Sequence, residues 1–207
     1  MLYDISPPIG IGTPVWPGDT PYDCRLAWSM QAGAPVNVSL LTTTPHLGAH
    51  ADATLHTEPR GEAIGLAPLE RYLGPCRVLK VPPTSLIEPR HLDGVELDRT
   101  PRLLFRTGSV EDRHRFPERF TALSPQLVSF LGEHGVVLVG LDTPSVDPFT
   151  SKTLEAHHAL AYHDIAILEN LLLDSVPEGV YELIALPLRL MDADASPVRA
   201  VLRTLEE

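Results

Sequence analysis

The sequence predicts an α/β or α+β protein built around a mixed β-sheet. Three observations lead to this prediction: strand-like runs outnumber helical patterns, the helical patterns fall between these runs, and 21 prolines mark frequent loops and turns. The 207 residues are enough for one domain with a substantial core, and no linker or repeat divides them. We therefore expect residues 1–207 to form a single domain.

The first third of the chain predicts a loop, a strand and a short turn. Residues 13–21 are dense in proline, glycine and aspartate, which indicates an irregular loop with Trp16 projecting from it. Residues 36–42 are rich in β-branched side chains and alternate in polarity, as a strand does. Residues 66–73 predict a short helical turn that a Gly-Pro pair closes.

The middle of the chain predicts three strands and one helix. Residues 77–81 and 103–107 are short apolar runs typical of buried strands. Ser124 and Pro125 are a helix N-cap and a first-turn proline, so a helix should begin there. Residues 136–141 form a continuous apolar run, as in a strand buried on both faces.

The last third predicts a second helix and two closing strands. Asp164 could cap a helix over residues 165–173, in which three apolar side chains share one face at helical spacing. Residues 181–186 and 198–202 have the composition of strands.

Composition and charge favour a small-molecule partner. The net charge is −11 and the basic residues are scattered, which argues against nucleic acid and against anionic membranes. The N-terminus has no basic region followed by an apolar run, and no stretch approaches the ~18 apolar residues of a membrane span. Cys24 and Cys76 are the only cysteines, so we expect reduced thiols in a cytoplasmic protein, with one disulfide as the alternative.

The segment HLGAHADATLH, which begins at His46, is the most informative part of the sequence. His46, His50, Asp52 and His56 all occupy even positions, and even positions share one face of an extended chain. Gly48 lies on the same face and leaves room for an ion or ligand to approach the backbone. These four side chains are all able to bind a metal ion or move a proton.

Strand geometry divides the roles of these side chains. In a straight strand His46 and His56 would lie ~33 Å apart, whereas His50 and Asp52 would lie ~6.6 Å apart. A histidine nitrogen must come within ~2.1 Å of zinc. His46 can therefore join the pair only if the chain bends, as the neighbouring proline and glycine allow. His56 is better suited to acid/base chemistry beside the metal.

Two other interpretations of this segment are open. A helix with His46 and His50 at i, i+4 is similar to an HExxH pair, but it lacks the glutamate and must accommodate a proline and a glycine. The histidines could also be ordinary core or surface residues. Three histidines and an aspartate on one face favour a metal or catalytic site, because burying them without partners would be costly. No GxSxG, P-loop, GxGxxG or CxxC motif is present.

A second cluster follows the predicted strand at 136–141, in a segment expected to be a loop. It consists of Glu155, His157, His158, His163, Asp164 and Glu169. Alone it would commonly be a solvated loop, but beside the first cluster it could complete a two-metal site with Asp52 as the bridging carboxylate. Such ligands suit Zn, Mn, Fe or Co.

The pattern His-x-Gly-Ala-His-x-Asp-x-Thr-x-His over residues 46–56 resembles the HxGTHxDxPxH motif of the metal-dependent cyclase-type hydrolases. Ala49 replaces the threonine and Thr54 the proline of that motif, and neither change removes a candidate catalytic group. The likeness covers nearly the whole chain, since it includes YDISPP at 3–8, WPGDTP at 16–21, GLDTPS at 140–145, SKTL at 151–154 and SPVRA at 196–200.

This resemblance implies a swivelling β/β/α fold, a homodimer and two zinc ions per chain. It implies that one zinc is held by His46, His50 and Asp52, and that Asp52 bridges to a second zinc held by His157 and Glu169. His56 would then be the acid/base, and Trp16 would line the substrate pocket. The role of Glu169 rests on its distance from His157 along the chain and on similar flanking residues.

Within the family the chain is similar to members that hydrolyse N-formyl-L-kynurenine to L-kynurenine and formate in tryptophan breakdown. The resemblance thus implies an amide hydrolase. One alternative is another amide or lactam hydrolase of the same family, such as an isatin hydrolase, which would share the first cluster. A second alternative is a metal-binding protein without catalysis, which would not need His56.

Overall fold

A nine-stranded mixed sheet runs through the protein, in a computed structural model that describes residues 1–97 and 100–205. The strands follow the spatial order β1 (Leu2–Asp4), β13 (Val201–Thr204), β11 (Gly179–Ile184), β5 (Leu73–Lys80), β7 (Arg102–Arg106), β9 (Leu138–Leu141), β10 (Ala166–Glu169), β4 (His50–Asp52) and β12 (Ala195–Pro197). Strands β5, β7, β9 and β10 pair in parallel, and antiparallel pairs flank them on both sides. The predicted α/β architecture around a mixed sheet is confirmed.

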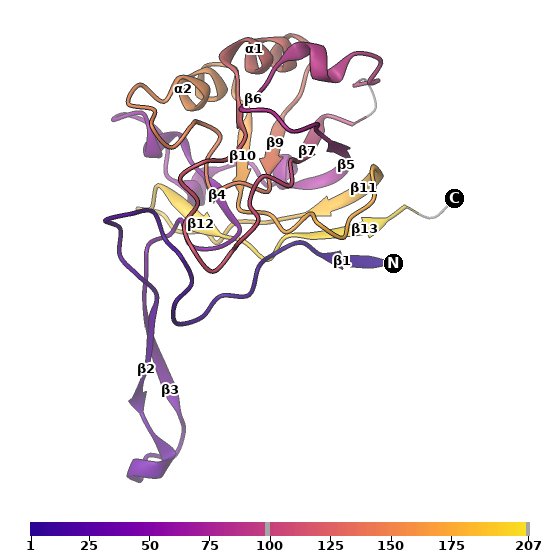
Figure 1. Ribbon diagram of the computed structural model, residues 1–207. Coiled ribbons are helices and arrows are strands. Elements are labelled where there is room, and N and C mark those ends of the chain that lie inside the picture. Colours follow the sequence, from indigo (N-terminus) through magenta and orange to yellow (C-terminus); the bar gives the residue numbers. More distant parts are fainter. Residues whose placement is uncertain (98–99, 206–207) are drawn as a thin grey trace.

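Two α-helices cover one face of this sheet, α1 (Pro125–Glu133) and α2 (Glu155–Tyr162), both at the top of Figure 1. Helix α1 begins as predicted, because the Ser124 hydroxyl accepts a hydrogen bond from the Leu127 N–H at 3.1 Å. Short connections complete the fold: the 3₁₀ turns Met30–Ala32, Thr54–His56, Ile64–Leu66, Leu69–Tyr72 and Pro89–Leu92, and the small parallel pair β6 (Leu86–Ile87) and β8 (Ala122–Leu123).

The central strands contribute to two cores, one on each face of the sheet. In β9, Val139 and Leu141 pack with the helices, whereas Leu138 belongs to the core on the other face. Strand β7 alternates in the same way, with Leu103 on the helix side and Leu104 opposite. Burial on both faces explains why the sequence of these strands is continuously apolar.

A two-stranded hairpin, which we call the arm (residues 23–42), projects away from this body (Figure 1). It consists of β2 (Asp23–Trp28) and β3 (Val38–Thr42), which pair only with each other within the described part of the chain. All five residues of β3 are exposed. Strand β3 confirms the strand predicted at 36–42, but the sequence does not reveal that it stands apart from the main sheet.

Most other predicted strands are present with shifted ends. The strand predicted at 77–81 begins earlier, at Leu73, so that the Gly-Pro pair lies inside β5 rather than ending a turn. The closing strand predicted at 198–202 is β13, which begins only at Val201. No helix in the two described stretches is long and apolar enough to cross a membrane.

The helix predicted over residues 165–173 is wrong. Ala166–Glu169 form strand β10, which pairs with β9 on one side and β4 on the other. Asp164 and Asn170, with φ of 56° and 55°, adopt left-handed conformations that end any regular structure at both sides. The apolar residues between them fill both cores, so their helical spacing is coincidental. The helix lies instead at Glu155–Tyr162, where a loop was expected.

Candidate metal centre

Strand β4, the second strand from one edge of the sheet, carries His50 and Asp52. Both side chains are buried, and they point to the same side because they lie two residues apart on one strand. The neighbouring strand β10 pairs with β4 in a register that sets Glu169 opposite His50. A short antiparallel pairing therefore brings together residues that are more than one hundred positions apart in the sequence.

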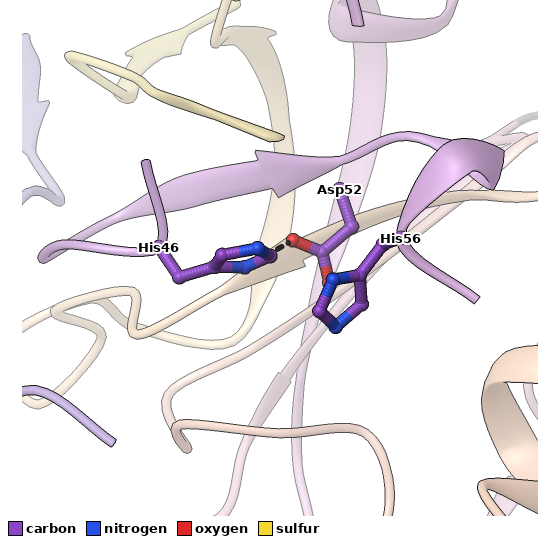
Figure 2. A group of neighbouring side chains, drawn as sticks. All are labelled: His46, Asp52 and His56. Atoms are coloured by element: carbon purple, nitrogen blue, oxygen red, sulfur yellow. Dashed lines mark ion pairs between the residues drawn. The ribbon is translucent and has the colours of Figure 1, made fainter. Parts of the chain in front are cut away.

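The chain bends at both ends of β4, which brings His46 and His56 back to Asp52. Gly48, with φ of +61°, takes the left-handed conformation on the N-terminal side. On the C-terminal side the 3₁₀ turn Thr54–His56 folds the chain back. The ring centroids of His46 and His56 are 4.2 Å apart, and Figure 2 shows Asp52 beside both imidazoles. The extended geometry considered for this segment thus holds only for the three residues of β4.

Helix α2 supplies His157 from the second cluster. The carboxylate of Asp147 accepts hydrogen bonds from the backbone N–H groups of Ala156 and His157 at 2.9 and 3.0 Å. It also lies 2.6 Å from Nδ1 of His157. The other ring nitrogen, Nε2, lies 3.6 Å from Asp52 Oδ2 and 3.7 Å from Glu169 Oε1. Asp147 therefore orients the His157 ring toward the centre.

Of the four remaining members of the second cluster, Glu155 is exposed in the first turn of α2, and the other three also lie outside the centre. His158 is exposed and its Nδ1 lies 2.8 Å from Glu58. Asp164 forms an ion pair with Arg71. His163 follows α2 at its C-cap. These three residues were therefore included in the predicted cluster with His157 only because they are near it in the sequence.

The two oxygens of Asp52 face different neighbours. Oδ1 lies 3.1 Å from His46 Nδ1 and 3.5 Å from His50 Nε2, whereas Oδ2 faces His157. The same Nε2 of His50 also lies 3.3 Å from Glu169 Oε2. Asp52 belongs to two sets of possible ligand residues. One set adds His46 and His56, and the other adds His50 and Glu169. Within each set, the possible ligand atoms lie within 4.8 Å of one another.

Several of these buried polar atoms have no hydrogen-bond partner among the residues that the structure describes: Nε2 of His50 and both carboxylate oxygens of Asp52. The contacts around Asp52 are short enough for ion pairs but do not have hydrogen-bond geometry. Buried polar atoms are nearly always satisfied, so a cluster of unsatisfied donors and acceptors calls for a further partner. Imidazole and carboxylate groups that converge in this way fit a divalent cation.

Nearby carboxylates raise the pKa values of His46 and His157, so without a bound metal ion these two rings hold protons tightly. Burial lowers the pKa of His46, but Asp52 and Asp194 outweigh it and raise that pKa to about 9. Burial also opposes the charge on His157, yet Asp147 and Asp52 raise its pKa to about 10. Asp52 has the opposite balance: burial raises its pKa, but the surrounding histidines hold it well below the usual value. A bound cation would replace these protons.

Two carboxylates that the sequence analysis missed support the histidines. Asp147 orients His157, and Oδ2 of Asp194 lies 3.0 Å from His46 Nε2 and 3.1 Å from His56 Nδ1. Asp194 follows β11 and directly precedes β12, far along the chain from both histidines. The only sequence signal for Asp194 was its position just before the SPVRA motif at 196–200. That position does not distinguish Asp194 from the nearby Asp192.

Trp16 lies on the wall of a large open pocket, of about 1290 Å³, that leads to the centre. The same pocket is lined by His46, His50, His56, His157 and Glu169. Trp16 packs against Phe116 and Phe149 with ring centroids 5.1 and 5.3 Å away, and it is 38% exposed. Its ring is thus held by neighbours and still accessible to a ligand. Two of the aromatic residues, Phe116 and Phe149, had no sequence signal.

The chain is similar in sequence to known proteins over nearly its whole length. The putative cyclase family model matches residues 3–148. Kynurenine formamidases from Bordetella pertussis and Bordetella bronchiseptica are each 53% identical over 205 residues, which is 99% of this chain and 98% of theirs.

Solved structures show the same fold. A potential metal-dependent hydrolase with cyclase activity is 25% identical, with a TM-score of 0.85 over 100% of this chain and 99% of its own. Isatin hydrolase A from Labrenzia aggregata is 22% identical, with a TM-score of 0.83 over 100% and 94% of the two chains. The chain described here belongs to the cyclase family of hydrolases and, within that family, to the kynurenine formamidases.

Proposed function

We propose that this protein hydrolyses the formyl amide of N-formyl-L-kynurenine and releases L-kynurenine and formate. The observation that carries the proposal is the convergence of three histidines and two carboxylates at the inner end of an aromatic-lined pocket. The identity of 53% with curated kynurenine formamidases over almost the full length supports the choice of substrate. The reaction is a step of tryptophan degradation.

The centre would hold two divalent ions. His46, His50 and Asp52 would bind one, and Asp52, His157 and Glu169 the other, with zinc the expected metal and Mn, Fe or Co as alternatives. The division of the Asp52 oxygens between His46 and His157 supports a bridging role. When bound, a divalent ion supplies Lewis acidity, which polarises a carbonyl group and makes water more acidic.

His56 would move the proton that the reaction requires. Hydrolysis breaks the bond between the formyl carbon and the aryl nitrogen, and the amine that leaves must be protonated. Imidazole accepts and donates protons near neutral pH. His56 lines the pocket, and its side chain is 31% exposed, unlike the buried rings of His50 and His157. It can therefore meet both the substrate and solvent.

The aromatic cluster of Trp16, Phe116 and Phe149 would bind the aryl ring of the substrate. Aromatic side chains prefer edge-to-face or offset contacts. Trp16 meets Phe116 edge-to-face, and Phe149 packs against both rings at tilted angles. A substrate ring placed beside Trp16 would extend this arrangement. The formyl group at the ring's ortho nitrogen could then reach the histidine and carboxylate groups.

The two alternatives explain the structure less well. An isatin hydrolase shares the fold, but its 22% identity is far below that of the kynurenine formamidases. A metal-binding protein without catalysis would have no use for a partly exposed histidine held by a carboxylate in an open pocket.

A substrate panel on protein of measured metal content tests the proposal. We expect N-formyl-L-kynurenine to give a higher kcat/KM than formanilide, aliphatic formamides and isatin. Chelation should abolish the activity, and added zinc should restore it. A preference for isatin would favour the first alternative. Metal-loaded protein that hydrolyses no member of the panel would favour the second.

We also propose that the protein is a cytoplasmic homodimer joined through the arm. The exposed large apolar side chains of the arm include Leu26, Trp28, Met30, Val38 and Leu41. An isolated two-stranded hairpin is at best marginally stable in water, so a second copy of the chain is the partner that would cover it. The free thiols of Cys24 and Cys76 agree with a reducing compartment.

A further inference from the structure

Asp194 contacts two histidines of different proposed function through a single oxygen. Its Oδ2 lies 3.0 Å from Nε2 of His46 and 3.1 Å from Nδ1 of His56. The sheet fixes its place, because Asp194 directly precedes β12 and its backbone oxygen accepts a hydrogen bond from the Ala53 N–H at 2.9 Å. Neighbouring β12 pairs with the strand that carries Asp52.

An ionised carboxylate has no proton to donate, so both ring nitrogens that face Asp194 must carry one. A neutral imidazole has a single N–H, and a hydrogen bond at one nitrogen therefore decides which nitrogen keeps its lone pair. In its neutral form, His46 therefore has its proton on Nε2 and its lone pair on Nδ1. For His56 the proton is on Nδ1 and the lone pair on Nε2.

These opposite tautomers match the different surroundings of the two rings. Nδ1 of His46 faces the proposed metal ligands, since it lies 3.1 Å from Asp52 Oδ1. His56 lies on the open pocket, and because Asp194 engages its Nδ1, the nitrogen left to act as a base is Nε2. If the His46 proton moved to Nδ1, the lone pair that a metal needs would point away from the centre.

We infer that Asp194 is a positioning residue that sets the tautomers of His46 and His56 in opposite senses. It prepares one ring to bind a metal ion and the other to move a proton. The catalytic role of the His56 tautomer rests on the proposed formamidase function. The assignment of the two tautomers does not depend on that function.

Side-chain ¹H–¹⁵N NMR of the zinc-loaded protein tests this inference directly, because the two ring nitrogens of each tautomer have different ¹⁵N shifts. The variants are Asp194→Asn and Asp194→Ala, and the matched control is Asp192→Asn, an exposed aspartate two residues away. Wild type and the control should show an Nε2–H on His46 and an Nδ1–H on His56. In Asp194→Ala the His56 assignment should be lost or mixed. His46 keeps its proton on Nε2 in any molecule whose zinc is bound to Nδ1, so at His46 the loss is read as weaker zinc binding. In Asp194→Asn at most one histidine should keep its bond to the remaining oxygen.

Zinc affinity and kinetics give two further readouts. We expect Asp194→Ala to weaken zinc binding and to lower kcat for N-formyl-L-kynurenine by about 10–100-fold each, as is usual for an outer-shell partner, with a smaller effect on KM. The dispersion of the backbone NMR spectrum reports whether each variant is folded. The inference is overturned if wild-type His56 carries its proton on Nε2, or if folded Asp194→Ala retains the His56 tautomer.

The outcome also separates this inference from the proposed function. Wild-type protein with the stated tautomers but no formamidase activity would refute the function and leave the role of Asp194 intact. Active wild-type protein whose His56 tautomer is unchanged in Asp194→Ala would refute the role of Asp194 and leave the proposed function intact.

Discussion

His56 is the residue on which the catalytic interpretation depends. It shares a face of the pocket with the proposed ligands, but it is partly exposed and bonded to Asp194 rather than to the buried carboxylates. We expect His56→Asn to lower kcat by roughly 10²–10⁴-fold, the usual cost of losing a positioned acid or base, with metal content unchanged. Steady-state kinetics and elemental analysis on the same sample measure both quantities.

The matched control for this variant is His158→Asn. His158 lies one position after a proposed ligand, but it is exposed and pairs with Glu58 outside the pocket. It should keep full activity. Loss of metal from His56→Asn would identify His56 as a ligand, and full activity with normal metal content would remove it from the mechanism.

The raised pKa values in the centre predict a link between metal binding and pH. At pH 7.5 the metal-free protein should hold protons on His46 and His157, whose pKa values are raised to about 9 and about 10. A metal ion binds only the neutral ring, so zinc binding should release about two protons per chain and should tighten as the pH rises. Calorimetric titrations in two buffers of different ionisation enthalpy give the number of protons released.

The same pKa values predict how the stability of metal-free protein depends on pH. A histidine whose pKa is higher in the folded than in the unfolded chain stabilises the fold fully below about pH 6.5. This contribution is lost as the pH rises through the folded values, here between about 9 and about 10. Urea unfolding of metal-free protein should therefore show lower stability at pH 10 than at pH 6.5. Zinc binding without proton release would contradict both expectations.

The first cluster could be found from the sequence because its members lie close together on one short segment. His46, His50, Asp52 and His56 meet as expected, although through two bends rather than along one strand. Asp194 could not be found in this way. It is 138 residues from His56, and only the pairing of β12 with β4 brings the two together.

The helices and strands differ in the same way. Some are determined by local sequence signals, and others by contacts with distant parts of the chain. Helix α1 was predictable because Ser124 caps it and Pro125 begins it, and both signals are local. Strand β10 was not, because its apolar residues fit a helical face as well as a two-sided strand. The left-handed residues Asp164 and Asn170 and the pairing with β9 and β4 decide the outcome. Spacing alone did not contain that information.

The arm is the element whose structure most requires a partner, and it leads to a prediction about assembly. Trp28 is 59% exposed near its tip. We expect the wild type to sediment as a homodimer at micromolar concentration and Trp28→Ser to weaken the dimer, because the substitution removes a large apolar contact. Sedimentation equilibrium measures the dissociation constant of each protein.

The control for the arm is Tyr162→Ser. Tyr162 is 85% exposed at the end of α2. Figure 1 shows this helix on the opposite side of the molecule from the arm. Losing its ring should leave the association unchanged. A monomeric wild type, or equal weakening by both substitutions, would exclude the arm as the dimer contact.

At the scale of the whole molecule, the sequence predicted a mixed sheet but not the order of the strands within it. The run at 103–107 indicated a buried strand and the run at 136–141 a strand buried on both faces, and β7 and β9 are indeed central. The antiparallel strands on either side come from opposite ends of the chain, and β1 pairs with β13. Such long-range pairing depends on how all the surfaces pack together, which no single segment encodes.

The distribution of charge over the molecule gives the last prediction. The chain carries a net charge of −11, but the described residues that line the pocket include Arg113, Arg115 and Lys152 against only Asp19 and Glu169 as acids. N-formyl-L-kynurenine ends in an amino acid group with a carboxylate and an ammonium. The basic side chains can bind that carboxylate, and Asp19 can bind the ammonium, so the pocket can distinguish this substrate from a simple aryl formamide.

Lys152→Gln tests this recognition, with Lys80→Gln as the matched control. Lys80 is the only other lysine of the chain, and it is exposed at the end of β5 away from the pocket. An exposed ion pair contributes up to about 1 kcal/mol, so Lys152→Gln should lower kcat/KM for N-formyl-L-kynurenine by roughly fivefold. Formanilide has the same aryl formamide without the amino acid group, and its kcat/KM should not change. Equal losses on both substrates would mean that Lys152 supports the pocket without recognising the carboxylate.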